Sequence, residues 1–102
     1  MEKVPPILYA EDNENDIELT LAAISECHLE NRVDIVRDGQ EVMDYLQYRG
    51  KYQDRPVERP VVIFLDIKMP RMDGIQTLHA IKADESLKTI PVVMLTSSSM
   101  ES

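Results

Sequence analysis

Hydrophobic residues in this chain form short uninterrupted runs. Residues 7–10, 61–65 and 92–95 are each continuously apolar or aromatic. Continuous apolarity is typical of strands that are buried on both faces, as in a parallel sheet covered by helices. Residues 33–36 carry one polar side chain among apolar ones, which predicts a fourth strand nearer an edge of the sheet.

Amphipathic segments separate these runs. Apolar residues recur at helical spacing over 15–27, 41–49 and 74–83, and Asn13 or Asn15 can cap the first of these helices. The alternation of strand and helix predicts a doubly wound α/β sheet.

Two segments do not fit the alternation of strands and helices. The polar segment 49–60 carries two prolines and is predicted to be an exposed connector. Near the end of the chain, Ser98 and Glu101 have the spacing of a capping box, which predicts that a further helix begins there. A chain that ends one turn into a helix is expected to be cut short. The alternative is a complete small domain with a serine-rich tail.

Composition narrows the classes of partner. With 102 residues the chain has room for one domain, and its 11 basic and 19 acidic residues give a net charge of −8. No basic stripe is present, so we expect no nucleic-acid partner. Cys27 is the single cysteine, which excludes an internal disulfide and a cysteine-ligated metal cluster. The longest apolar run, 61–65, is too short to cross a bilayer, so we expect no membrane partner and a cytoplasmic location.

Carboxylates follow two of the predicted buried strands. Glu11 and Asp12 come directly after the strand 7–10, and Asp66 comes directly after the strand 61–65. Ligands of open parallel sheets bind at the carboxyl ends of the strands. If the two strands are neighbours, the three carboxylates converge and repel one another, and a hard divalent cation such as Mg²⁺ relieves the repulsion. With such a cation bound, one carboxylate can attack a phosphorus atom.

Four motifs in a fixed order then resemble one family. The segment 66–74, Asp-Ile-Lys-Met-Pro-Arg-Met-Asp-Gly, is similar to the phosphoacceptor loop of response-regulator receiver domains. Glu11-Asp12 resembles the acidic pair of that family, and Asp38-Gly39 resembles its turn before the second helix. The segment 91–96 resembles its fourth strand, which ends in a Ser or Thr switch residue. Together the motifs span essentially the whole chain.

The resemblance implies a fold, roles and partners. It implies a flavodoxin-like sheet, with Asp66 as the phosphorylated nucleophile. Glu11, Asp12, Asp66 and the backbone carbonyl of Lys68 would hold Mg²⁺, and Thr96 would donate its hydroxyl to the phosphoryl group. The phosphoryl donor would be a sensor histidine kinase, and the chain looks most like single-domain receivers that serve bacterial phytochrome kinases. It would be a signalling module and not an enzyme.

The chain departs from the family pattern at its end. The family has the sheet order 2-1-3-4-5 and a lysine after the fifth strand, and the printed sequence stops at Ser102 before either. We therefore expect residues 1–102 to be a receiver domain truncated at its C-terminus, with strand order 2-1-3-4 and the last helices missing. An exposed apolar edge at 92–95 predicts a homodimer or larger assembly. The alternative function is an interaction module that is not phosphorylated.

Three other classes place carboxylates or phosphates at strand ends. A Toprim-like nuclease and a haloacid-dehalogenase-type phosphatase both need Asp-x-Asp, whereas Asp66 is followed two residues later by Lys68. A flavodoxin-like FMN binder needs a loop rich in glycine and hydroxyl groups after the first strand. Glu11 and Asp12 occupy that place and would repel the phosphate.

Overall fold

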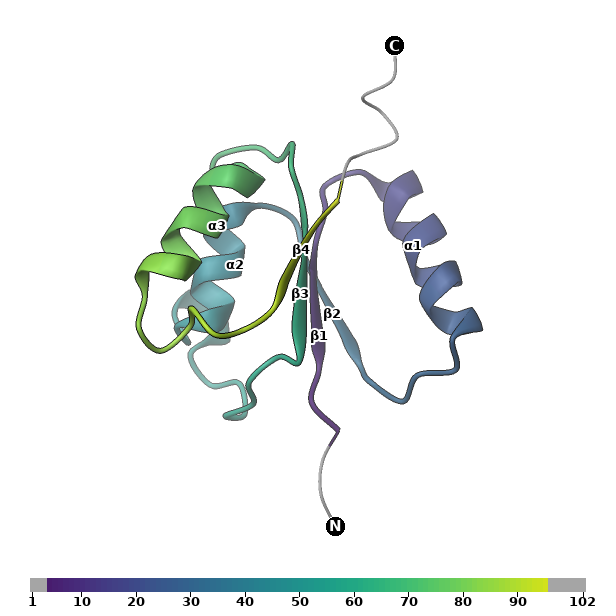
Figure 1. The fold of residues 1–102 in the computed structure, drawn as a ribbon, viewed down its shortest axis with the longest axis horizontal. Helices are drawn as coiled ribbons and strands as arrows, with labels where there is room; N and C mark the ends of the chain where they lie inside the picture. Colours follow the sequence, from purple (N-terminus) through teal and green to yellow (C-terminus); the bar gives the residue numbers. More distant parts are fainter. Residues whose placement is uncertain (1–3, 96–102) are drawn as a thin grey trace.

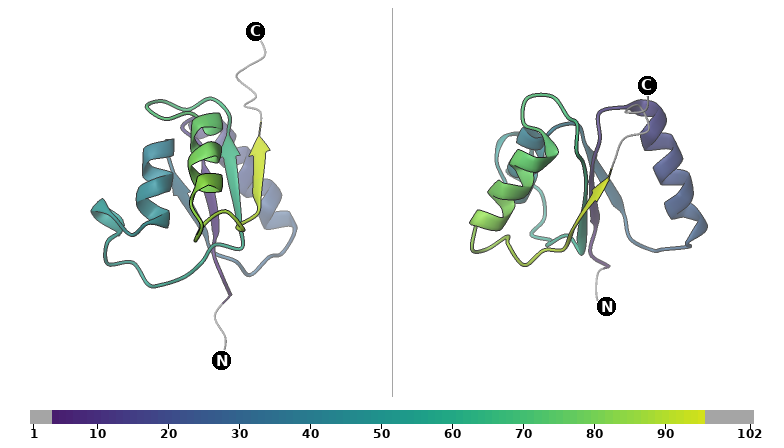
Figure 2. Two further views of the ribbon diagram at one scale, coloured as in Figure 1. Left: turned by 60° about the vertical axis from the view of Figure 1, so that its left-hand side comes forward. Right: turned by 45° about the horizontal axis from the view of Figure 1, so that its top comes forward.

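The computed structural model describes residues 4–95 and forms a three-layer α/β arrangement (Figure 1). The elements follow one another as β1 (Ile7–Ala10), α1 (Glu14–Glu26), β2 (Val33–Val36), α2 (Gly39–Leu46), the short 3₁₀ turn η1 (Gly50–Tyr52), β3 (Val62–Asp66), α3 (Gly74–Ala83) and β4 (Val92–Leu95). The helix α1 covers one face of the sheet, and α2 and α3 cover the other (Figure 1, Figure 2).

The sheet is parallel throughout and has the order β2-β1-β3-β4. All four residues of the central strand β1 are buried, as its continuous apolar sequence predicts. Ala10 of β1 is in register with Val36 of β2 and with Leu65 of β3, so the three strands end at the same level. The predicted strand order 2-1-3-4 and the doubly wound α/β class are confirmed.

Helix limits follow from local capping. Asn13 caps α1 by accepting a hydrogen bond from the backbone N–H of Asp16, and Asp38 caps α2 by accepting from Glu41. The helix α2 therefore begins two residues earlier than predicted. It also ends earlier, at Leu46, because Tyr48 has a positive φ of 58° that helical residues do not adopt. The limits of α3 agree with the prediction.

The two faces of the sheet are packed to different degrees. Under α2 and α3 lies the main core, which includes Leu8, Val42, Ile63 and Ile81. On the other face α1 buries Asp16 and Ile17 in its first turn, but Thr20, Leu21 and Ile24 further along the helix are only half-buried. A hollow of about 340 Å³ remains there, against α1, β3 and β4.

The segment between α2 and β3 is a largely exposed connector that is anchored at Arg55. The guanidinium of Arg55 stacks on the rings of Tyr45 and Tyr48, at 3.7 and 4.3 Å from their centroids. Arg55 also donates a hydrogen bond to the carbonyl of Tyr45 at 2.9 Å. Most residues of the segment 49–60 are exposed, so the predicted exposed connector is confirmed, and the cation over aromatic rings anchors it at one residue.

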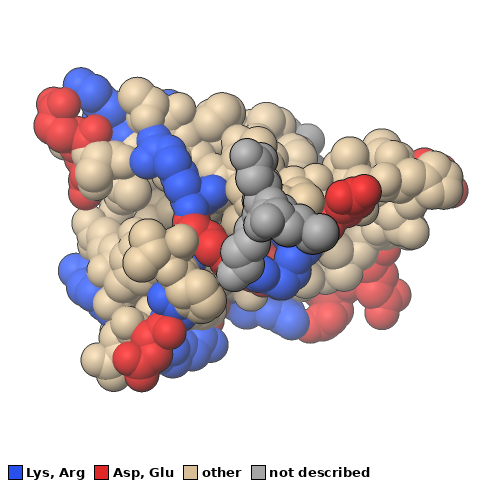
Figure 3. All heavy atoms as spheres, turned by 90° about the horizontal axis from the view of Figure 1, so that it is seen from below, with Lys and Arg blue, Asp and Glu red and all other residues tan. Residues whose placement is uncertain are grey.

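Charges are mixed on the face of the molecule at the amino ends of the strands. Acidic and basic side chains alternate there with uncharged ones, without a continuous surface of one sign (Figure 3). Within residues 4–95, the helices are too short or too polar to span a membrane. The opposite end of the sheet is different, because carboxylates gather there.

Candidate functional site

Three acidic residues meet at the carboxyl ends of β1 and β3. Glu11 and Asp12 directly follow β1, and Asp66 is the last residue of β3. Because β1 and β3 are hydrogen-bonded neighbours, the two strand ends lie side by side. One carboxylate oxygen from each residue lies within 4.8 Å of the others. The structure thus brings together the carboxylates that the sequence predicts to converge.

Burial makes this cluster electrostatically unfavourable when it is fully charged. Asp66 is completely buried and Glu11 is 2% exposed, whereas Asp12 is exposed. Burial, with the charge of Asp66 beside it, raises the pKa of Glu11 to about 7. Burial also raises the pKa of Asp66, and the charge of Asp12 adds to this effect. A positive partner would therefore stabilise the site.

Asp66 lacks such a partner among the residues that the structure describes. Neither of its carboxylate oxygens accepts a hydrogen bond there, although both are buried. Buried polar atoms are almost always paired, so an unpaired carboxylate indicates a place for a ligand or ion. Both oxygens of Asp66 are therefore available to a ligand or ion at the site.

Glu11, in contrast, is held at both oxygens. The hydroxyl of Tyr9 lies 3.4 Å from Oε1, and the backbone N–H of Asn13 donates to Oε2 at 3.3 Å. The hydroxyl of Tyr9 is itself 3.0 Å from Oγ1 of Thr20 on α1, and burial raises the pKa of Tyr9 to about 12. Glu11 is thus fixed in orientation by β1, by the following loop and by α1.

Sequence reasoning missed one further acidic residue of the cluster. Asp16, in the first turn of α1, is 7% exposed, and its charge raises the pKa of both Glu11 and Asp66. The signal was its place beside Ile17, on the side of the helix that faces the sheet. An acidic residue in a helix's first turn is ordinarily explained by the helix dipole, which hides such a contribution.

The donor set fits a hard divalent cation. All the candidate side-chain ligands are carboxylate oxygens, which Mg²⁺ and similar ions prefer, and the unpaired oxygens of Asp66 leave coordination positions free. Lys68, whose backbone carbonyl is the predicted further ligand, lies in the loop after Asp66 with its side chain exposed. Thr96 lies outside the described residues.

The loop that follows Asp66 folds back, so that its last residues contact the end of β3. Gly74, at the start of α3, donates its backbone N–H to the carbonyl of Ile67 at 2.9 Å. A Cβ atom on Gly74 would lie only 2.3 Å from the carbonyl oxygen of Asp66. Only glycine permits this close approach. The helix α3 therefore packs directly beneath the residue that ends β3.

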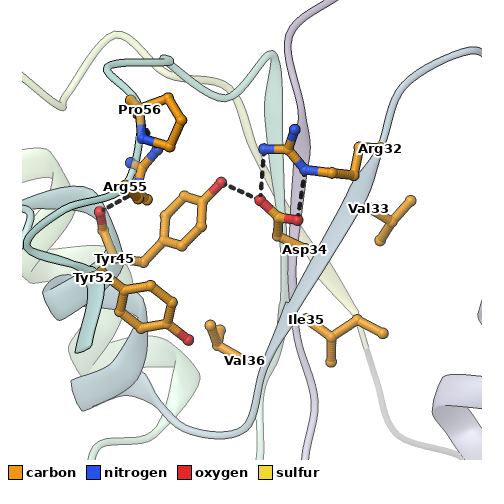
Figure 4. Close-up of a pocket in the computed structure, with 9 residues that line it drawn as sticks. All are labelled: Arg32, Val33, Asp34, Ile35, Val36, Tyr45, Tyr52, Arg55 and Pro56. Carbon is orange, nitrogen blue, oxygen red and sulfur yellow. Dashed lines mark hydrogen bonds and ion pairs between the residues drawn. The ribbon is translucent and has the colours of Figure 1, made fainter.

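A separate hollow of about 380 Å³ lies along the edge strand β2 (Figure 4). Its charged groups are paired with one another: Arg32 forms a two-pronged ion pair with Asp34, and Tyr45 donates to Asp34 at 2.6 Å. These groups are already satisfied, so this hollow lacks the unpaired polar atoms of the carboxylate cluster.

Fold and site together define the class of the protein: a doubly wound α/β domain with an acidic cluster at the carboxyl edge of a parallel sheet. Residues 7–102 match the model of the response regulator receiver domain. The chain belongs to this family, whose members are the receiving modules of two-component signalling.

Individual response regulators are similar to this chain over nearly all of its length. Response regulator Rcp1 from Synechocystis sp. is 39% identical over 102 residues, which are 98% of this chain and 68% of that protein. The structure of the bacteriophytochrome response regulator AtBRR is 48% identical with a TM-score of 0.91, covering 95% of this chain and 69% of that one. The phosphorylated cyanobacterial phytochrome response regulator RcpA is 41% identical with a TM-score of 0.83, covering 94% and 67%.

A structure of Rcp1 has been determined in an Mn²⁺-bound form, and it superposes with a TM-score of 0.84 at 38% identity, covering 96% of this chain and 69% of that one. This chain is therefore similar to phytochrome response regulators over about two thirds of their length. It is also similar to a protein that binds a divalent cation, which agrees with the acidic cluster.

Proposed function

We propose that this chain receives a phosphoryl group on Asp66 from a sensor histidine kinase and signals by a change of conformation. The observation that carries the proposal is the Asp66 carboxylate itself, which is buried, has a raised pKa and lacks a hydrogen-bond partner among residues 4–95. Such a group is costly to keep unless a ligand uses it.

Each residue of the site has a distinct part in the transfer. An oxygen of Asp66 forms a bond to phosphorus while the phosphorus–nitrogen bond of the kinase phosphohistidine breaks, and the imidazole leaves with the bonding electrons. Glu11, Asp12 and Asp66, with the backbone carbonyl of Lys68, would hold Mg²⁺. Bound there, the ion supplies positive charge that neutralises the phosphate oxygens. Thr96 would donate its hydroxyl to the transferred group.

The contact of Tyr9 with Glu11 supports these roles. Because Tyr9 and the backbone of Asn13 fix both oxygens of Glu11, this carboxylate stays in place when Asp66 changes from carboxylate to phosphoryl carrier. Asp66, without such restraints among the described residues, keeps its lone pairs for the reaction.

The phosphoryl donor and the partners can also be proposed, from the similar proteins and from the exposed edge of the sheet. Similarity to AtBRR, RcpA and Rcp1 supports a kinase of the phytochrome type as the donor. We propose a cytoplasmic signalling module without catalytic turnover of its own and without nucleic-acid or membrane partners. We also propose that it self-associates through β4, which pairs only with β3 among the described strands.

Phosphotransfer from a histidine kinase tests the proposal. A phytochrome-type kinase carrying radiolabelled phosphohistidine should label the wild-type chain and leave Asp66→Asn unlabelled, since an amide oxygen is a poor nucleophile. Asp54→Asn, which removes an exposed carboxylate outside the cluster, should be labelled normally. Equal labelling of Asp66→Asn would refute the assignment of the acceptor.

A further inference from the structure

The loop between β3 and α3 contains a residue in an unfavourable backbone conformation. Arg71 has a φ of 64°, in the left-handed region that residues with a side chain rarely adopt without compensation. The backbone N–H of Met72 donates to the carbonyl of Pro70 at 2.7 Å, which closes a tight turn around Arg71. Other contacts must hold this turn in place.

The compensating contact comes from another part of the chain. The guanidinium of Arg71 donates two hydrogen bonds to the carboxylate of Asp38, at 2.9 and 3.0 Å. This is the two-pronged geometry that arginine makes with a carboxylate, which fixes direction as well as distance. Asp38 is 8% exposed as a residue and also caps α2 through the backbone N–H of Glu41, at 2.8 Å. Its carboxylate therefore cannot move without disturbing the helix.

A backbone contact lies beside the ion pair. Gly39 donates its N–H to the carbonyl of Met72 at 3.0 Å. A Cβ on Gly39 would lie 2.4 Å from that carbonyl oxygen and 2.0 Å from Oγ1 of Thr77, so the two segments are in direct contact. The start of α2 and the tip of the loop are thus joined by a side-chain pair and by the backbone.

The Arg71–Asp38 pair and the Gly39–Met72 hydrogen bond anchor the tip of the β3–α3 loop to the start of α2. At its base, next to β3, the loop is closed by the hydrogen bond between Gly74 and Ile67. Lys68 lies between Asp66 and the attached turn at Arg71, so the path of its backbone depends on both anchors. Arg71 and Asp38 lie outside the cluster of Glu11, Asp12 and Asp66, and their charges offset each other.

We infer that Arg71 and Asp38 form a positioning pair, which holds the β3–α3 loop in the shape that presents its backbone carbonyl to the cation. The inference rests on the proposed function, because it assigns the pair a role in the same cation site. The pair acts through the loop and not through its charge.

An effect of charge and an effect of positioning predict opposite changes in cation affinity for Arg71→Gln. Removal of positive charge in Arg71→Gln would tighten cation binding if charge alone acted, and removal of negative charge in Asp38→Asn would weaken it. Loss of positioning weakens binding in both variants. Arg71→Lys keeps the charge but loses the two-pronged geometry, so it too should bind more weakly. In Asp38→Asn the amide oxygen still caps α2, because Asn and Asp are similarly good caps.

Titration of the chain with Mg²⁺, followed by backbone amide resonances in NMR spectra, tests the inference. Each of the three single variants should raise the dissociation constant about 10-fold, the lower end of the typical cost of losing a group that orients a metal ligand. The double variant Asp38→Asn with Arg71→Gln should lose no more than either single variant, because both remove the same contact.

Two controls accompany this titration. Arg32→Gln breaks a similar two-pronged pair at the other end of β2, with Asp34, and should leave the dissociation constant unchanged. Unfolding of every variant in metal-free buffer separates lost stability from lost binding. Tighter binding by Arg71→Gln, or unchanged binding by all three single variants, would overturn the inference. Asp12→Asn tests the proposed site itself: if it binds Mg²⁺ like the wild type, the proposed function fails first.

Discussion

Replacing Asp66 by Asn should stabilise the protein when no metal ion is present. The substitution removes one of three carboxylates whose closest oxygens lie within 4.8 Å of one another. Two unit charges at that separation repel by about 3 kcal/mol at an effective dielectric constant of 20. Asp12 is exposed and its charge is screened by solvent. We therefore expect a net gain of about 2 kcal/mol in the free energy of unfolding.

The gain should depend on pH in a defined direction. The pKa of Glu11 is raised from 4.5 to about 7 in the folded protein. Between these two values the folded state binds the proton more strongly than the unfolded state, so the stability of the wild type falls as the pH rises through this window. In Asp66→Asn a source of this shift is absent, and the decline should be smaller. The difference between the two proteins should be largest above about pH 7.

Addition of Mg²⁺ should make the wild type more stable than Asp66→Asn. A ligand that binds only the folded state adds RT ln(1 + [L]/Kd), about 2.7 kcal/mol at 100 times the dissociation constant, which exceeds the gain of about 2 kcal/mol expected for Asp66→Asn without metal. The variant has lost a charged ligand and should gain less. Thermal melts with EDTA or with Mg²⁺ measure both effects, and a gain of 2 kcal/mol corresponds to a rise in Tm of roughly 10 °C for a domain of this size.

Asp54→Asn is the control, because it removes an exposed carboxylate outside the cluster. It should change neither the stability in EDTA nor the response to Mg²⁺ appreciably. Equal or lower stability of Asp66→Asn relative to the wild type, in EDTA above neutral pH, would refute the predicted repulsion. A response of the variant to Mg²⁺ as strong as that of the wild type would refute the role of Asp66 as a ligand.

Three further predictions concern other parts of the fold. Gly74→Ala should cost about 2–3 kcal/mol in chemical denaturation, because its Cβ would lie 2.3 Å from the carbonyl oxygen of Asp66; an unchanged midpoint would contradict this. Burial alone would raise the pKa of Asp34, but hydrogen bonds from Arg32 and Tyr45 lower it below its ordinary value. The stabilisation is therefore present above the unfolded pKa and lost as the pH falls through the folded one. In urea denaturation, Asp34→Asn should therefore cost about 1 kcal/mol near neutral pH and less once the pH has fallen through that lowered pKa. Finally, sedimentation should show a dimer or larger species that dissociates when Val93, which is 42% exposed on β4, is replaced by Lys; a wild-type monomer at micromolar concentration would argue against pairing through β4.

The parts of the fold that depend on local composition could be predicted from the sequence. Continuous apolar runs identified β1, β3 and β4, and Gly74 with its capping residue Asp73 set the start of α3. The end of α2 could not be predicted, because it depends on Tyr48 adopting a positive φ beneath the stacked Arg55. Composition does not encode such a contact.

In the candidate site too, some residues could be predicted from the sequence and others could not. Glu11, Asp12 and Asp66 could be predicted because each lies at the carboxyl end of a strand, and parallel strands end at a common edge. The support around them could not. Tyr9 and Thr20 are separated by 11 residues in the sequence, and Arg71 and Asp38 by 33. Such contacts are decided by the packing of helices on the sheet and not by any local pattern.

Treatment with acetyl phosphate, followed by intact-mass and peptide analysis, tests the central claim most directly. Asp66 as acceptor predicts one added phosphoryl group that appears only with Mg²⁺, maps to the peptide containing Asp66 and is absent from Asp66→Asn. A chain that keeps its unmodified mass would contradict the claim. So would a phosphoryl group on Thr96, Ser97 or Ser98, or one that persists in Asp66→Asn.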